Sequence, residues 1–446
     1  MKDLRKFFVH FTLIPAIAII CAILFAFPAT GFSQQTTENH EETADHAMDS
    51  AKIEGHESEE AHACHFHGDI EETEFDATNT AYHHIADANV YSIGSFNFPL
   101  PCILYSKGQG IDMFSSKKFD FEFYGHGDGH KAYNRYVLTE SQVKHIVDPS
   151  FPLGEADLEG FTHDMTTVDG KTITNVYACF QGKHYLLEAQ STADGGLFGG
   201  GLTSFYDFSI TKNVLSMILI SLLLGWAFFG IAKAYRNRAT LAPKGLQSLV
   251  EPIFLFIQDE VAKPFLGPKW EKFLPMLCAL FFFILALNLF GQIPFLGGSN
   301  VTGNLAVTAV LALVAFVVVT INGNKHYWSH IVWMPGVPAI IKILILTPVE
   351  ILGVFIKPFT LMLRLFANIT AGHIVVLSFV GLIFVFGKMG QSVAGAAGGF
   401  LVAAPLTMFI MAIELLVAFI QAYVFTLLVA SYIGAATEEH HHAEKH

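Results

Sequence analysis

The chain has 446 residues, of which 52% are hydrophobic and 15% charged. Runs of about 18 or more nearly uncharged residues crowd its second half, whereas the residues before about 210 contain one such run, at the extreme N-terminus. This pattern excludes a wholly soluble protein. The formal net charge of −13 arises in residues 34–76, which hold 14 Asp or Glu against Lys52, so the acidity describes a tail rather than a partner-binding surface.

Residues 1–33 predict a signal peptide for export. Lys2, Arg5 and Lys6 precede an apolar core from Phe7 to Phe27, and small residues that fit a cleavage site follow. The apolar run is long for a signal, so a retained N-terminal anchor is the alternative. If the signal is used, the residues that follow lie outside the cytoplasm.

Residues 34–80 predict a disordered, acidic and His-rich segment, because so few large apolar side chains cannot offset the entropy of ordering. This segment contains a cluster of candidate ligands for zinc or copper, namely His62, Cys64, His65 and His67. No second ligand pair follows at a zinc-finger spacing. A solvated polar tail is the simpler interpretation, and no metal or other cofactor is expected.

Residues 81–200 predict a small β-rich domain in the periplasm. Short segments rich in aromatic and β-branched residues alternate here with Gly, Pro and Asp. These segments are Val90–Phe98, Phe119–Tyr124, Thr172–Phe180 and His184–Glu188. The domain has no evident catalytic constellation, and five glycines within residues 191–201 predict a linker to the membrane part.

Three cysteines fall in the exported part, Cys64, Cys102 and Cys179, so one disulfide leaves one cysteine over. Cys102 with Cys179 is the favoured pair, because both lie in strand-like segments. The sequence alone leaves this pairing open.

The membrane half, residues 205–437, predicts an all-α polytopic domain with five spans. The spans are Val214–Ala232, Phe273–Phe295, Leu305–Ile321, Pro338–Phe386 and Leu401–Ile433. Gly245–Leu266 is amphipathic and is expected at the membrane surface. Basic clusters fall on one side if the spans alternate, which predicts a periplasmic N-terminal domain and a cytoplasmic C-terminal tail, residues 438–446.

Two of these spans are too long to stand upright. As helices, Pro338–Phe386 and Leu401–Ile433 would extend roughly 70 Å and roughly 50 Å, against a hydrocarbon core of about 30 Å. Steep tilting, a break near Pro348 or Pro358, or a surface-lying entry segment must absorb the excess. A pair of steeply tilted helices suits a protein that curves around a round partner.

The first long span carries ionisable side chains, which are costly in a bilayer and so require a reason. Glu350, Lys357 and Arg364 are seven residues apart and therefore share one helix face. Asn368 lies one turn beyond Arg364, whereas His373 lies about 180° round the helix from it. This stripe predicts that Arg364 and His373 have different surroundings.

The last span repeats the pattern, because Glu414 and Gln421 are also seven residues apart in an otherwise apolar helix. A lone polar residue on an apolar helix is usually a satisfied packing contact. So many polar side chains on two adjacent spans favour a function instead.

Residues 363–373, with the sequence LRLFANITAGH, resemble the signature of ATP synthase subunit a, which reads L-R-L-F-x-N followed by small residues. Asn288-Leu289, Ile293-Pro294 and residues 302–305 resemble the family's preceding spans. Residues 243–266 resemble its cytoplasmic amphipathic helix. The resemblance covers residues 205–437, and residues 34–200 exceed the family's usual short exported N-terminus.

The resemblance implies a non-catalytic, proton-translocating subunit of a rotary F-type ATP synthase, in the bacterial inner membrane. It would provide two half-channels against the c-ring, so that proton flow drives rotation and ATP synthesis. The implied partners are the c-ring, with one membrane carboxylate in each c subunit, the b subunits of the peripheral stalk and the lipid bilayer. No nucleic acid is expected.

The resemblance also implies that Arg364 faces the ring. Its guanidinium, which stays protonated, would attract each deprotonated carboxylate and block proton leakage between the half-channels. Asn368 would be its polar neighbour on that interface.

His373 and Glu414 fit a relay from the outside to the ring, since imidazole titrates near neutral pH and a carboxylate partner tunes it. Many bacterial relatives carry this acid and this histidine in exchanged positions, and a direct contact between the two is therefore predicted. Gln421 would line the same path, and Glu350 would lie nearer the cytoplasmic exit. Some relatives carry a carboxylate just after the Asn288 position, whereas Gly291 and Gln292 stand here, so the outer entrance is not predicted.

Two other classes compete with this interpretation. A secondary ion transporter, in which Arg364 binds an anionic substrate, would predict inverted repeats, and none is evident. A metal-handling membrane protein would draw on the 21 histidines, although the spans contain essentially His373 alone. Co-purification with a c-ring would favour the first class, and metal-dependent uptake would favour the last.

Overall fold

The computed structural model describes residues 64–66, 86–93, 96–121, 128–168, 171–192, 201–237, 242–293, 300–332, 339–388 and 391–438. The predicted signal peptide and, apart from residues 64–66, the predicted disordered segment lie outside these residues. The chain divides into two compact units. One contains Asp87–Lys212 with residues 64–66, and the other contains the helices of Asn213–His446.

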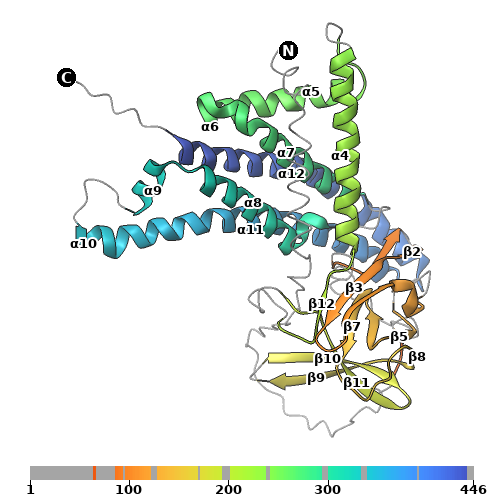
Figure 1. Cartoon of the computed structure of the whole chain (residues 1–446). Helices are drawn as coiled ribbons and strands as arrows, with labels where there is room; N and C mark the ends of the chain where they lie inside the picture. Colours follow the sequence, from red (N-terminus) through yellow and green to blue (C-terminus); the bar gives the residue numbers. More distant parts are fainter. Residues whose placement is uncertain are drawn as a thin grey trace, which may run out of the picture. The chain divides into compact units, whose positions relative to one another are not determined.

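The first unit is built from three antiparallel sheets (Figure 1). The seven-stranded sheet has the order β8-β5-β6-β7-β11-β10-β9, the three-stranded sheet has the order β12-β3-β4, and β1 pairs with β2. The strands are β1 (Val90–Ile93), β2 (Phe96–Pro99), β3 (Pro101–Ser106), β4 (Gly110–Ser115), β5 (Lys131–Tyr133), β6 (Tyr136–Thr139), β7 (Gln142–Ile146), β8 (Glu155–Asp157), β9 (Gly160–Val168), β10 (Lys171–Phe180), β11 (Lys183–Glu188) and β12 (Phe205–Asp207). A short 3₁₀ helix, η4 (Ser116–Phe119), follows β4.

The alternation of buried and exposed side chains along these strands explains how the core forms. On β3 the side chains of Cys102, Leu104 and Ser106 are buried, while Pro101 and Tyr105 are exposed, as the two-residue period of a half-buried strand requires. The buried residues of this face pack into one apolar cluster, and a second cluster lies under the seven-stranded sheet.

The strand predictions were right in part. Thr172–Phe180 and His184–Glu188 fall within β10 and β11, and Val90–Phe98 is a hairpin of two strands. Phe119–Tyr124 is wrong as a strand where it is described, because Phe119 ends η4 and Phe121 forms an isolated bridge. β12 pairs with β3, so this sheet includes residues beyond the predicted boundary at residue 200.

The predicted disulfide is wrong. The structure joins Cys64 to Cys179, and Cys102 is a buried free thiol whose pKa is raised to about 12 by burial. The reason is topological, since β3 and β10 belong to different sheets. His65 exchanges two backbone hydrogen bonds with Phe161 on β9, and this bridge brings the neighbouring Cys64 to β10.

The second unit confirms five helical segments long and apolar enough to cross a membrane: Lys212–Asn237, Leu246–Gly291, Leu305–Asn322, Leu344–Phe386 and Val393–Thr437. Its elements are α4 (Lys212–Asn237), α5 (Leu246–Phe256), α6 (Lys263–Leu266), α7 (Trp270–Gly291), α8 (Leu305–Asn322), α9 (Lys325–Val332), α10 (Ala339–Ile341), α11 (Thr347–Phe386) and α12 (Val393–Thr437). Two π-helical stretches, η5 (Ile257–Ala262) and η8 (Lys342–Leu346), and two 3₁₀ turns, η6 (Gly267–Lys269) and η7 (Val301–Gly303), connect them.

Local sequence sets where several helices begin. The Asn304 side chain accepts a hydrogen bond from the Ala306 amide at the start of α8, and Ser392 does the same for Gly395 at the start of α12. α7 is apolar all round, and residues 277–285 are buried without interruption, which identifies it as the central helix of this unit.

α11 and α12 lie side by side and run across α4 in Figure 1. With 40 and 45 residues they extend roughly 60 Å and roughly 68 Å at about 1.5 Å per residue. α11 continues through Pro358, so the break considered there is absent, and Pro348 lies in the first turn of α11, directly after the π-helical stretch η8. Helices of this length fit a bilayer only when steeply tilted.

Candidate functional site

The packing of α11 on α12 brings His373 and Glu414 together, as predicted. Nδ1 of His373 lies 3.1 Å from Oε1 of Glu414, and the two side chains are 16% and 6% exposed. Gly372 makes this approach possible, since a Cβ atom there would lie 2.9 Å from Oε1 of Glu414. The pair is therefore a buried carboxyl group and a half-buried imidazole held between α11 and α12.

Two amide side chains at the end of α7 donate hydrogen bonds to the backbone of α12 near Glu414. Nε2 of Gln292 donates to the backbone carbonyl of Glu414 at 2.9 Å, and Nδ2 of Asn288 donates to the carbonyl of Ala418 at 3.2 Å. The sequence interpretation gave neither residue a role in the site. Their four-residue spacing places both on one face of α7, and that spacing was the available signal.

Gln421 is buried on α12, 7% exposed. It lies seven residues beyond Glu414, hence on nearly the same face of the helix. The polar residues of the last span thus point into the unit rather than away from it.

Arg364 and Asn368, unlike the buried Gln421, lie on an exposed face of α11. Both side chains are exposed in this chain, while Leu361, Leu365 and Ile369 turn into the core. Among the residues that the structure describes, no carboxylate forms an ion pair with Arg364. A guanidinium on the outer face of a membrane-depth helix requires an anionic or polar partner from elsewhere.

Glu350 and Lys357 are half-buried on the same helix. Nζ of Lys357 lies 5.5 Å from the ring centroid of Tyr432 on α12, within the range of a cation–π contact. A small cavity between α8, α11 and α12 is lined in part by Tyr327, Lys357 and Tyr432. The polar stripe predicted along α11 therefore begins at the half-buried Glu350 and Lys357 and continues to the exposed Arg364.

Two of the four candidate metal ligands in the N-terminal segment lie in the described residues. Cys64 forms a disulfide with Cys179, and the backbone of His65 bridges Phe161 on β9. His62 and His67 lie outside the described residues.

Comparison with known proteins gives two family matches. A family model described as ATP synthase A chain matches residues 214–434, and one described as a domain of unknown function matches residues 80–150. The first covers the five apolar segments almost completely, and the second covers part of the β-sheet unit.

Three relatives illustrate the similarity. The chain is 39% identical over 254 residues to ATP synthase subunit a of Chloroherpeton thalassium, covering 54% of this chain and 72% of the relative. It is 42% identical over 247 residues to ATP synthase subunit a 2 of Chlorobaculum tepidum, covering 54% and 66%. It is 38% identical over 284 residues to ATP synthase subunit a of Anaeromyxobacter dehalogenans, covering 58% and 70%.

Proposed function

The chain belongs to the ATP synthase A chain family, and from that premise we propose that it forms two proton half-channels against a ring of c subunits, with Arg364 between them. One observation carries the proposal. Arg364 and Asn368 are exposed on the outer face of α11, whereas the half-buried His373 and the buried Glu414 meet between α11 and α12.

Arg364 acts in this proposal as a fixed positive charge. Guanidinium does not lose its proton in proteins, so Arg364 attracts a deprotonated ring carboxylate but carries no proton itself. Each carboxylate must release its proton before it passes Arg364, and direct leakage between the half-channels is blocked. Asn368, one turn away on the same exposed face, is a polar contact for the same carboxylate.

His373 and Glu414 form the outer relay. Their 3.1 Å separation allows a proton to pass between imidazole and carboxylate with little movement. Asn288, Gln292 and the buried Gln421 supply polar groups beside this path. Glu350, at the start of α11, lies on the cytoplasmic exit side.

The remaining assignments follow the same proposal. The chain lies in the bacterial inner membrane with a periplasmic β-sheet domain and a cytoplasmic C-terminus, after export directed by residues 1–33. It binds the c-ring through the exposed face of α11 and the b subunits of the peripheral stalk elsewhere. It catalyses no ATP chemistry itself.

Replacement of Arg364 tests the barrier. Arg364→Ala is expected to abolish ATP-driven proton pumping in inverted membrane vesicles, because no positive charge then favours the deprotonated form of the ring carboxylate. Lys325→Ala, which removes a positive charge from α9, is the matched control and should leave pumping near wild type. Normal pumping by assembled Arg364→Ala complexes would refute the proposed role.

The relay is tested by a double-mutant cycle. His373→Ala and Glu414→Ala should each reduce pumping at least about tenfold, and the double variant should lose little more, because the residues act as one unit. Pumping rates are normalised to the amount of assembled complex. Multiplicative losses would show that the two residues work independently.

A further inference from the structure

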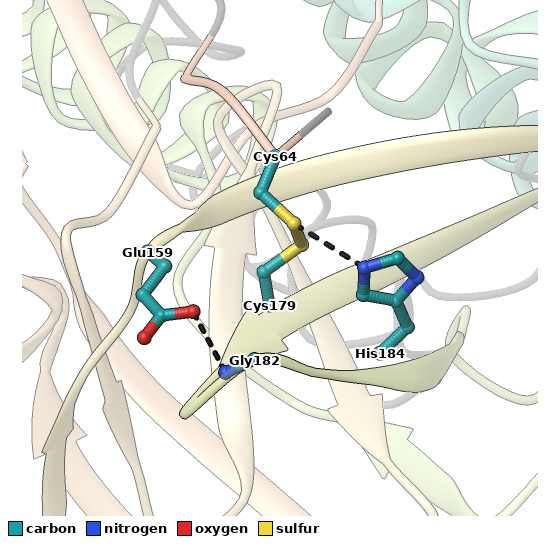
Figure 2. Close-up of a disulfide and its surroundings, with 5 residues drawn as sticks. All are labelled: Cys64, Glu159, Cys179, Gly182 and His184. Carbon is teal, nitrogen blue, oxygen red and sulfur yellow. Dashed lines mark hydrogen bonds between the residues drawn. A yellow bond between two sulfur atoms is a disulfide. The ribbon is translucent and has the colours of Figure 1, made fainter. Parts of the chain in front are cut away.

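The disulfide of the β-sheet unit lies beside a histidine on a tightly built hairpin (Figure 2). Cys179 on β10 and His184 on β11 are direct cross-strand partners. Gln181 and Gly182 connect the strands with φ of 51° and 69°, the left-handed pair of a type I′ turn. Oε2 of Glu159 accepts a hydrogen bond from the Gly182 amide at 3.0 Å and braces this turn.

The third member of this group comes from far along the chain. Nε2 of His184 lies 3.5 Å from Sγ of Cys64, and the candidate ligand atoms of Cys64, Cys179 and His184 all lie within 4.8 Å of one another. Zn–S bonds of about 2.3 Å and Zn–N bonds of about 2.0 Å place a thiolate and an imidazole roughly 3.5 Å apart in a tetrahedral site. His184 therefore already stands at ligand distance from Cys64.

We propose that Cys64, Cys179 and His184 form a redox-gated site for a thiophilic d¹⁰ cation, Zn²⁺ or Cu⁺. Two thiolates and one imidazole are the ligand types these ions prefer. The two sulfurs must separate to roughly 3.8 Å in a tetrahedral site. Their Cα atoms are 6.1 Å apart, so side-chain rotation suffices and the sheet is not disturbed.

Loading the site requires a two-electron reductant of the disulfide, such as a dithiol. One reductant thiolate attacks Sγ of Cys64, which is half-buried while Cys179 is buried, and Cys179 leaves as a thiolate. The second reductant thiol then displaces Cys64, so the reductant is oxidised to a disulfide and two electrons and two protons reach the chain. Zn²⁺ replaces the two thiol protons on binding. Disulfide and metal are thus alternative states of one site.

The exposure of the three residues fits exchange with solvent. His184 is exposed and Cys64 is half-buried, whereas Cys179 is buried on the sheet. A reductant and a hydrated cation can reach the outer two ligands, and the inner one anchors the ion to the hairpin. Three protein ligands leave the fourth position open to water.

Metal titration of the full-length chain in detergent tests this proposal. Co²⁺ and Zn²⁺ are added to the chain as purified and after reduction with a phosphine, and the thiolate-to-cobalt charge-transfer absorption is recorded. The reduced chain should develop this absorption with about one Co²⁺, displaced by stoichiometric Zn²⁺, and the oxidised chain should not. A Cu⁺ titration of the reduced chain separates the two cations.

Matched variants make the outcome decisive. His184→Ala should weaken Co²⁺ binding at least about tenfold, while His163→Ala, a histidine on β9 outside the group, should not. Cys64→Ser should abolish the absorption, while Cys102→Ser should preserve it, because the Cys102 thiol is buried with its pKa raised to about 12. Equal absorption from oxidised and reduced chains, or unchanged affinity in His184→Ala, would overturn the proposal.

Discussion

Single residues decide how closely α11 and α12 approach at the pair of His373 and Glu414. The sequence predicted the contact between His373 and Glu414 from chemistry and a family signature. It did not predict Gly372 as the residue that makes room for Glu414, because that role depends on which helix packs against which glycine. Likewise, the hydrogen bonds of Asn288 and Gln292 to α12 depend on how α7 docks.

Gly372→Ala should therefore impair proton transfer without unfolding the chain. The new methyl group would lie 2.9 Å from Oε1 of Glu414, so the carboxylate must rotate away from His373. We expect ATP-driven pumping to fall about tenfold, equivalent to about 1.4 kcal/mol in the barrier. Acidification rates of vesicles with equal amounts of assembled complex provide the measurement.

Gly353→Ala provides the control for this prediction. It adds the same methyl group to the same helix, where a Cβ atom would meet nothing within 4 Å. Pumping should stay at the wild-type rate. If both variants pump equally, the separation of His373 and Glu414 does not limit transfer.

Among the elements, the packing of β7 on its neighbouring strands buries a histidine. His145 is 7% exposed, its Nδ1 lies 2.7 Å from Oγ of Ser204, and its ring packs 4.9 Å from that of Tyr136 on β6. Burial lowers the pKa of His145 from 6.5 to about 4, against the opposing charge of Glu188. The folded sheet therefore holds His145 neutral.

Acid should destabilise this sheet through His145. Between pH 6.5 and about 4 the unfolded chain binds a proton that the folded chain excludes, so stability is present above this window and is lost as pH falls through it. The loss amounts to roughly 3 kcal/mol, since one pKa unit corresponds to about 1.4 kcal/mol. Hydrogen exchange of the β6 and β7 amides in the full-length chain measures it.

His145→Gln isolates this contribution, because glutamine keeps polar atoms at the position but does not titrate. The difference in exchange stability between wild type and variant should shrink towards pH 4.5. Asp207, whose pKa is raised by burial, contributes equally to both proteins and cancels. A constant difference across the pH range would exclude His145 as the titrating group.

The sequence predicted the long membrane helices better than it predicted the short strands. Apolar runs of this length allow little besides membrane helices, so the five spans were predictable. Short strands such as β8, with the polar sequence Glu155–Asp157, are defined by their pairing partners rather than by their own residues. β12 follows a glycine-rich stretch and was not predicted, because it too is defined by its pairing partner rather than by its own residues.

At the scale of the whole molecule, family membership favours the proton-channel interpretation over the secondary-transporter and metal-handling alternatives. The membrane unit carries that assignment, whereas part of the β-sheet unit matches a domain of unknown function. The cysteine pairing could not be predicted from the sequence. A disulfide requires two Cα atoms within about 7 Å of each other, and this distance depends on how the chain folds. Two segments 115 residues apart in the chain meet here.

That separation gives the Cys64–Cys179 link a consequence for biogenesis. A covalent bridge across 115 residues restricts the unfolded chain by about 4 to 5 kcal/mol in the chain-entropy model. Disulfides form and persist in oxidising compartments, so at the proposed periplasmic location the β-sheet domain would reach its full stability only after translocation. A zinc ion bound by the same two sulfurs in the reduced chain would close the same loop.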